Sequence, residues 1–102
     1  MWAILRINNN KYKMLTKSLN AELKSKAIFY FPKVIIEKIK LNKRKKTQCS
    51  VLGNYIFCYH NSFKNPKNIE KLKFVHGLKY FLKNYNNYQK DIIEFINYCK
   101  NN

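Results

Sequence analysis

The sequence predicts one α/β sandwich of the α+β class, in which helices flank a mostly antiparallel four-stranded sheet. Short β-prone runs alternate with amphipathic runs in the order β-α-β-β-α-β-α, and this order favours a sheet with helices packed on it. The hydrophobic fraction of 46% and the aromatic fraction of 16% are too high for a disordered chain. With 102 residues there is room for one core, so we expect a single domain over 1–102.

The first half of the chain predicts a strand, a helix and a second strand. Residues 2–7 are apolar and β-prone, and three asparagines follow them, so they predict the first strand. Between 11 and 25 the apolar residues recur every three or four positions and form one helical stripe: Tyr12, Leu15, Leu19 and Leu23. The run 27–38 is rich in β-branched and aromatic residues and predicts a long strand, in which Pro32 indicates an edge or a bulge.

The second half of the chain predicts two more strands and two more helices. We expect strands at 51–59 and 78–82, and a short helix at 68–75 after the break at Asn65-Pro66. The run 88–100 predicts a closing amphipathic helix, because its apolar residues share one side: Ile92, Phe95, Ile96 and Cys99. No repeat or linker divides the chain.

Charge gives the first functional indication. The chain has 21 Lys and Arg against five acids, a net charge of +16. Such a surface attracts polyanions, which makes nucleic acid the first candidate partner and an anionic membrane surface the second. A source with A- and T-rich codons would also enrich Lys and Asn, and this accounts for part of the charge. It does not explain why acids are so few.

The remaining composition argues for a cytoplasmic protein without chemistry of its own. No apolar stretch approaches a membrane span, and residues 1–7 do not resemble a signal peptide. Three cysteines without metal-ligand spacing indicate free thiols in a reducing compartment. Cys58 and His60 share one strand face, but a half-buried strand explains them better than a metal site. Without a glycine-rich phosphate loop or a pair of catalytic acids, we expect no enzyme, no catalytic residue, no metal and no cofactor.

Two segments stand out as candidate binding elements. A basic run at 42–46 lies between two predicted strands, within a hairpin of about 38–50, and its charges favour phosphate contacts over a merely solvated turn. In the third strand, alternation directs Tyr55, Phe57 and Tyr59 to one face and Ile56 and Cys58 to the other. Both faces are apolar. Either helices cover both faces, or the aromatic face meets a partner.

The third strand resembles that of the NusG-type amino-terminal domain, whose usual form is aromatic-Pro-Gly/Asn-Tyr followed by apolar residues. Asn54, Tyr55, Ile56 and Phe57 agree with this form, closest to RfaH-like specialised paralogues, while Leu52 and Gly53 depart from it. Three other segments match in order and spacing: Trp2 with its apolar successors, Phe31-Pro32 with 36–39, and 76–82. The resemblance covers essentially the whole chain.

The resemblance implies a transcription elongation or antitermination factor that binds RNA polymerase. In the family, an apolar depression docks on the clamp helices of the largest subunit, and the opposite side touches the gate loop of the second-largest subunit. Bridging the cleft holds the clamp shut and suppresses pausing. The matching clamp-helix residues would be Ile4, Leu52, Tyr55, Phe57, Phe81, Ile92 and Phe95. The gate-loop side would include Asn68, Ile69, Lys71, Leu72 and Lys73.

The resemblance also implies that basic residues lie near upstream or non-template DNA. These would be Lys11, Lys13, Lys17, Lys24, Lys43, Arg44, Lys45 and Lys46, through phosphate contacts without sequence specificity. The family's usual carboxy-terminal KOW barrel does not follow the last helix, so we expect a monomer that recruits neither the ribosome nor the termination factor. Arg6 departs from the family pattern, because relatives often carry an apolar or aromatic residue at that edge of the docking site.

Two other functions fit the sequence. The element order and the segment 53–56 also resemble, more faintly, an RRM, a module that stacks single-stranded RNA on strand aromatics. A phage-type regulator that occupies the polymerase site and competes with the host NusG would share all the features above.

Overall fold

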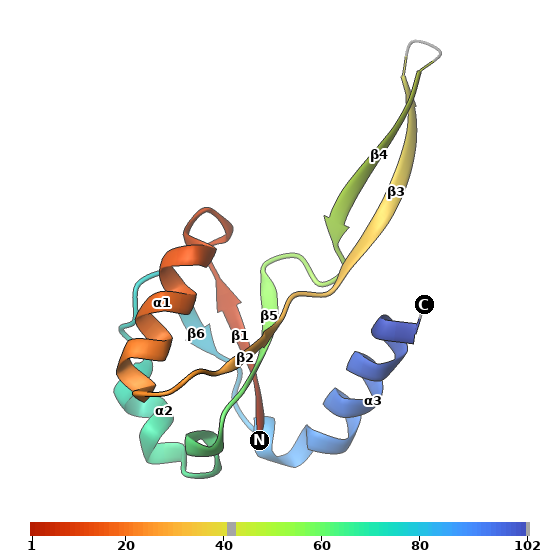
Figure 1. Ribbon diagram of the computed structural model, residues 1–102. Helices are drawn as coiled ribbons and strands as arrows, with labels where there is room; N and C mark the ends of the chain where they lie inside the picture. Colours follow the sequence, from red (N-terminus) through yellow and green to blue (C-terminus); the bar gives the residue numbers. More distant parts are fainter. Residues whose placement is uncertain (41–42, 102) are drawn as a thin grey trace.

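The computed structural model describes residues 1–40 and 43–101, apart from the side chains of residues 9, 34–40, 45 and 47–50. It confirms the α+β class, with a four-stranded antiparallel sheet and three α-helices (Figure 1). The sheet has the order β2-β5-β1-β6. Its strands are β1 (Trp2–Ile7), β2 (Ile28–Tyr30), β5 (Tyr55–Tyr59) and β6 (Leu78–Phe81).

Two interleaved β-α-β units build this sheet. Helix α1 (Tyr12–Leu23) connects β1 to β2, and β5 lies between these strands. Helix α2 (Pro66–Leu72) connects β5 to β6, and β1 lies between those. This arrangement is the split β-α-β topology. Short 3-10 helices precede α1, α2 and α3: η1 (Asn9–Lys11), η2 (Asn61–Lys64) and η3 (Tyr85–Tyr88).

Helices cover both faces of the sheet. On one face, α1 and α2 pack their buried leucines against alternate residues of the central strands, among them Leu5 and Ile56. On the other face, helix α3 (Gln89–Asn101) packs Ile92 and Ile96 against Phe57. Strand β5 is therefore buried on both sides, which answers the question left open by its sequence. The same burial raises the pKa of the Cys58 thiol to about 12.

The predicted long strand at 27–38 is two strands. After β2, the chain passes through the buried Pro32 into β3 (Lys33–Lys40), which pairs only with β4 (Lys43–Ser50) in a separate two-stranded sheet. Proline has no N–H for a ladder bond, so the ladder of β2 stops there. The carbonyl of Pro32 instead accepts a hydrogen bond from Val51 at 2.9 Å and closes the base of the hairpin.

The β3–β4 hairpin projects from the domain and gives the molecule its length of 53 Å against 28 and 21 Å (Figure 1). The sequence does not predict strand β4, because its residues have almost no apolar pattern. Its pairing with β3 makes it a strand. The third strand is correspondingly shorter than predicted: it begins at Tyr55, because a turn at Gly53 precedes it. The tip residues 41 and 42 lie outside the described chain.

Gly77 allows α1 to approach the start of β6. Its φ is +86°, and its carbonyl accepts a hydrogen bond from Asn8 at 2.9 Å. A Cβ there would lie 2.9 Å from the carbonyl oxygen of Lys11 and 3.1 Å from Cβ of Leu15. Both the backbone angle and the space therefore require glycine.

We predict that Gly77→Ala lowers the free energy of unfolding by about 2–4 kcal/mol, because backbone strain and a clash with backbone add. Gly53→Ala is the matched control: Gly53 also has a positive φ, of +64°, but no atom lies within 4 Å of its added Cβ. Its free energy of unfolding should fall by only about 1 kcal/mol, because only the positive φ is unfavourable for alanine there. Urea unfolding followed by circular dichroism measures both, and equal losses would contradict the close-approach explanation.

Candidate partner-binding surface

An apolar depression of about 280 Å³ lies between α3 and the sheet. Five of its lining residues belong to the predicted clamp-helix set, and they come from distant parts of the chain: Ile4, Leu52, Phe57, Ile92 and Phe95. Tyr88 and Asp91 complete the lining. The fold thus gathers Ile4 of β1, Phe57 of β5, Leu52 of the turn before β5 and one face of α3 around a single hollow.

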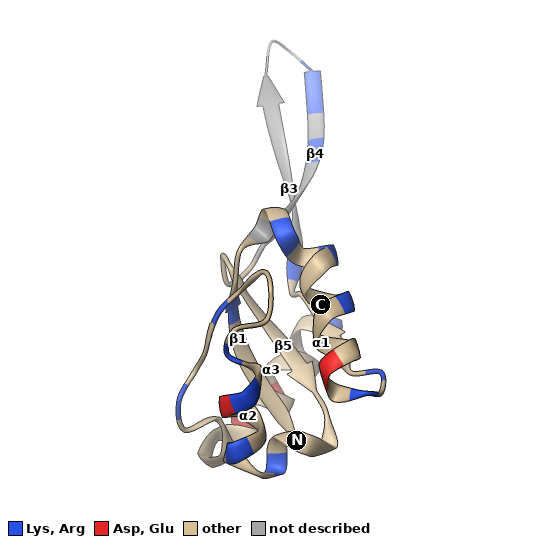
Figure 2. Cartoon of the chain, turned by 90° about the vertical axis from the view of Figure 1, so that its left-hand side faces the viewer, with Lys and Arg blue, Asp and Glu red and all other residues tan. Residues whose placement is uncertain are grey.

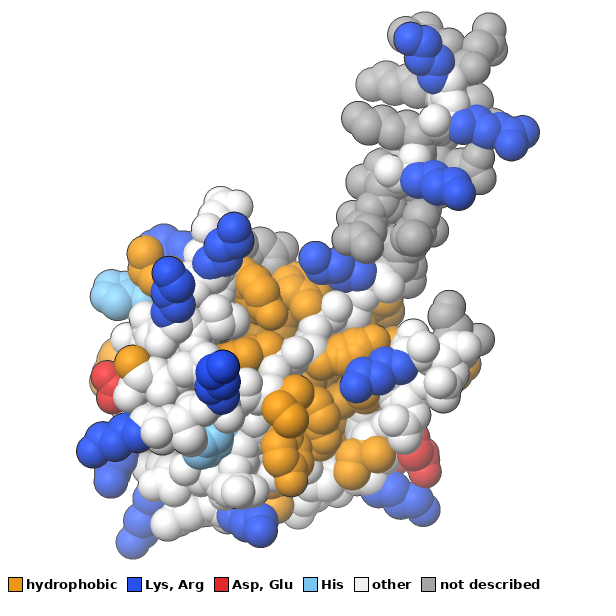
Figure 3. All heavy atoms as spheres, in the orientation of Figure 1, with side chains coloured by type: hydrophobic (Ala, Val, Ile, Leu, Met, Phe, Trp, Pro, Cys, Tyr) orange, Lys and Arg blue, Asp and Glu red, His pale blue; other side chains and the backbone are white. Residues whose placement is uncertain are grey.

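Within this depression, deep and accessible residues have different roles. Phe57 is only 3% exposed and forms the floor, with its ring 5.7 Å from that of Phe95. Leu52 and Phe95 are half-buried, so they present apolar surface at the rim of the hollow. Figure 3 shows hydrophobic side chains on the face with the β2 edge, between the α1–α2 layer and α3, with Lys and Arg around them. At the depression itself, a partner would meet apolar side chains and one acid, Asp91.

Gln89 fixes α3 against the sheet. Its side-chain oxygen accepts a hydrogen bond from the Trp2 N–H at 2.8 Å, and its side-chain nitrogen donates to the Trp2 carbonyl at 2.6 Å. The same nitrogen donates to the Tyr85 carbonyl at 2.8 Å. Strand β6 pairs with β1 further along, where the Leu82 N–H donates to Ile4. The Gln89 side-chain amide therefore forms the two hydrogen bonds with the Trp2 backbone that a residue of a neighbouring strand would form.

A polar cluster continues the same sheet face beyond Ile4. Arg6 donates from Nη1 to the Tyr55 hydroxyl at 3.2 Å and lies 5.2 Å from the centre of that ring. The hydroxyls of Tyr55 and Tyr80 are 3.0 Å apart. The pKa of Tyr55 is lowered mainly because its hydroxyl oxygen accepts a hydrogen bond from the Tyr80 hydroxyl, and also because it accepts one from Arg6. The pKa of Tyr80 is raised because its proton is held in the hydrogen bond to Tyr55. Arg6 is thereby held in place, open to solvent, about 7 Å along the strand from Ile4.

Phe81 is not part of the depression, although the resemblance placed it in the clamp-helix set. It packs on the α2 side of the sheet, with its ring 5.9 Å from that of Phe63. Its neighbours Tyr80 and Leu82 alternate to the α3 side. Tyr55, the remaining member of the set, lies in the polar cluster next to the depression.

The predicted gate-loop residues lie on and just after α2, which packs on the opposite face of the sheet from α3 (Figure 1). Leu72 is core, and Ile69 is half-buried against it. The Asn68 side chain donates to the Ser62 carbonyl at 2.9 Å and braces η2. Lys71 and Lys73 are exposed, and Lys73 pairs with Glu70 at 2.9 Å. Of these five residues, the two lysines are the most exposed.

Basic residues are spread over the helices, loops and hairpin (Figure 2). Lys11, Lys13 and Lys17 line one shallow hollow at the start of α1, together with Met14. Lys24 is exposed at the other end of this helix, about 18 Å away, so it does not join them. Lys43, Arg44 and Lys46 are exposed on β4, and the side chain of Lys45 lies outside the described residues.

The histidine and cysteine considered as metal ligands have structural partners. Cys58 is buried in the main core, and His60 accepts a hydrogen bond from the Ser62 N–H and bonds the Ser25 hydroxyl. Within residues 1–40 and 43–101, no three His, Cys, Asp or Glu residues are grouped as a metal site would need. No helix in the described part of the chain combines the length and apolarity needed to cross a membrane.

Neither a protein-family model nor a curated protein matches this chain. The surface described above therefore rests on its own geometry. Sequence reasoning missed Tyr88, Asp91, Gln89 and Tyr80. The amphipathic pattern of 88–100 could have indicated the first two, because Tyr88 directly precedes α3 and Asp91 lies in its first turn. No sequence pattern marks a side-chain amide that binds a strand.

We predict that Gln89→Leu lowers the free energy of unfolding by about 1–3 kcal/mol, because it removes three hydrogen bonds and leaves two half-buried groups of Trp2 without this partner. Asn97→Leu, at an exposed position of the same helix, should change it by less than about 0.5 kcal/mol. Urea unfolding of the two variants tests this, and equal stability would refute the role of Gln89.

Proposed function

We propose that this protein is a transcription elongation or antitermination factor that binds RNA polymerase through the depression between α3 and the sheet. The observation that carries the proposal is the convergence of Ile4, Leu52, Phe57, Ile92 and Phe95 on one hollow. The NusG-type resemblance implies clamp-helix docking for these same residues. A resemblance in the order of sequence segments does not by itself require that residues from three distant segments line one hollow.

The chemistry of the depression favours a helix as its occupant. An amphipathic helix buries an apolar stripe in a groove and meets charges at its margins. Here the stripe would cover Leu52 and Phe95, with Asp91 on the lining and Arg6 further along the same sheet face. An acid and a base at separate places favour one orientation of a helix that carries the complementary charges.

The opposite face supplies the second contact in this proposal. Lys71 and Lys73, beyond the sheet from the depression, would face the gate loop, so that the domain spans the cleft between two subunits. Holding both sides would keep the clamp shut and suppress pausing without any catalytic residue. The lysines of α1 and the hairpin would face upstream DNA and set the salt dependence of binding.

A single-stranded RNA-binding module is the second candidate, and one observation favours it. Tyr55, Tyr80 and Arg6 form a part of the sheet face with the ring and cation that stack on bases. Helix α3, however, covers Phe57, the central aromatic of that face. Tight binding of single-stranded RNA without polymerase, lost in Tyr55→Ala, would support this function over the first.

We predict that Leu52→Glu weakens binding to purified bacterial RNA polymerase at least about tenfold, because a charge replaces apolar surface at the rim. Ile93→Glu is the matched control, because Ile93 is 46% exposed on the other side of α3. Fluorescence anisotropy of the labelled protein measures both affinities, and circular dichroism checks folding. Phe57 is unsuitable because its substitution would disturb the core. Equal affinities of Leu52→Glu and wild type would reject the docking site.

We also predict that Arg6→Glu weakens polymerase binding about tenfold, whereas Arg6→Lys, which keeps the charge, retains most of the affinity. The same anisotropy titration at two salt concentrations should show a shallower salt dependence for Arg6→Glu. An elongation assay through a pause site gives the sign of the effect. Faster passage supports an elongation factor, and slower passage with intact binding supports a regulator that competes with the host NusG.

A further inference from the structure

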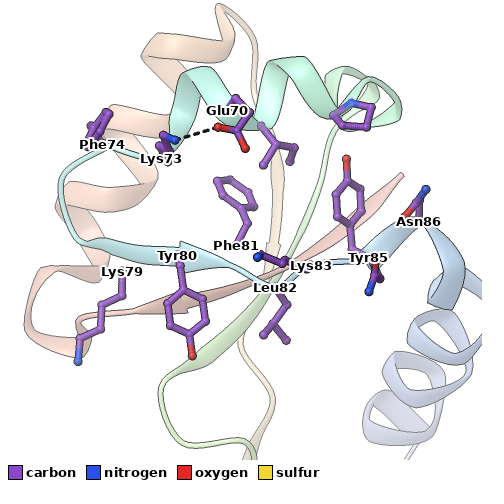
Figure 4. Close-up of a pocket in the computed structure, with 13 residues that line it drawn as sticks. Glu70, Lys73, Phe74, Lys79, Tyr80, Phe81, Leu82, Lys83, Tyr85 and Asn86 are labelled. Carbon is purple, nitrogen blue, oxygen red and sulfur yellow. Dashed lines mark hydrogen bonds and ion pairs between the residues drawn. The ribbon is translucent and has the colours of Figure 1, made fainter.

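A cavity of about 780 Å³ lies on the open edge of the sheet. It follows β6 and is bordered by α2 and by the turn that leads to η3 (Figure 4). Ile69 and Lys73 are shared with the predicted gate-loop side, and most of the remaining lining belongs to β6 and the residues after it. It is separate from the depression beneath α3.

Strand β6 presents unpaired backbone to this cavity. In the four-stranded sheet it has a single neighbour, β1. The Leu82 N–H donates to the Ile4 carbonyl at 2.8 Å, and Tyr80 pairs with Arg6 in register. Backbone groups alternate in direction along a regular strand, so the N–H and C=O groups of Phe81 face away from β1, on the side of the cavity. The register shifts between Arg6 and Ile7, so this alternation does not extend to Lys79. The Phe81 groups are the bonding edge that an added strand needs.

The cavity also reaches the side chains on both faces of this edge. In Figure 4, Phe81 points toward α2, whereas Tyr80 and Leu82 point the opposite way. Ile69 of α2 lines the same space on the Phe81 side. A strand lying about 4.8 Å from β6 would therefore place alternate side chains against Phe81 and against Tyr80.

Charge selects the kind of strand that can bind. Lys73, Lys79 and Lys83 line the cavity, and its one acid, Glu70, already accepts a hydrogen bond from Lys73 at 2.9 Å. A second copy of this chain would bring the same lysines and a charge of +16, so like charges oppose self-pairing. Lysines on an edge strand often serve only to prevent pairing with another copy of the chain. Prevention of self-pairing does not require a wide cavity lined by Ile69 and Phe81.

We propose that β6 accepts an extended acidic segment of a partner protein as an added strand. Backbone hydrogen bonds to Phe81 hold the segment. Apolar residues at alternate positions contact Phe81 and Ile69, and the acidic residues between them meet Lys79 and Lys83. Phe74, which is 89% exposed with Lys73 5.8 Å from its ring centre, lies at one end of the cavity and extends the apolar contact. This site shares no lining residue with the depression beneath α3.

The test uses a fluorescent synthetic peptide of about eight residues in which Val and Glu alternate, a strand-length probe. Its binding to the full chain is followed by anisotropy. We expect Lys79→Glu combined with Lys83→Glu to weaken binding at least about tenfold by reversing the charge. Phe81→Pro should abolish binding, because proline removes the outward N–H of Phe81, which makes no bond to β1. Phe81→Ala, the matched control, loses the same side chain but keeps this N–H, so it should bind more weakly than wild type but measurably.

A second measurement does not depend on any variant. Amide hydrogen exchange of the wild type should slow at Phe81 when the peptide binds, and not at Tyr80, whose amide faces β1. Leu52→Glu should bind the peptide like wild type, which separates this site from the depression beneath α3. Three results would overturn the proposal: no binding to wild type, equal binding to Phe81→Pro and Phe81→Ala, or displacement of the peptide by a single-stranded RNA without amide protection, which would indicate a general polyanion surface.

Discussion

The hydrogen bonds between the Gln89 side chain and the backbone of Trp2 hold the two layers of this protein together at one place. They complete the ladder of β1 where β6 no longer pairs with it, and they start α3 at the edge of the sheet. Ile92 and Ile96 then fall onto Phe57, and the helix covers a face that would otherwise expose a central aromatic strand. The apolar depression is the part of that face that α3 leaves open.

The two proposed binding sites use different physical interactions. The depression beneath α3 offers apolar side chains with charged groups near its margin, which suits a preformed helix. The edge of β6 offers backbone groups and lysines, which suit a segment that becomes ordered only on binding. Because they lie on different parts of one rigid sheet, the domain could hold a structured partner and an extended acidic one at the same time.

The structure narrows what the net charge implies about binding partners. Among the described residues, the basic side chains assigned to DNA lie in separate places: three lysines gather at the start of α1, others follow the projecting hairpin, and Lys24 is remote from the first group. Arg6 differs from these because two tyrosines fix its position next to the apolar depression. Spread charges steer a polyanion toward the domain, whereas a fixed cation can discriminate between partners.

The sequence by itself determined the fold class, because periodicity survives folding: the stripe of Leu15 and Leu19, the apolar side of 88–100 and the apolar run 2–7 all became buried faces. It also grouped Ile4, Leu52 and Phe95, through a resemblance. Tertiary structure alone decided where the strand at 27–38 divides, which side of the sheet Phe81 faces, and which strand edge stays open. These depend on pairing between distant segments, and backbone hydrogen bonds leave no pattern in the residues that make them.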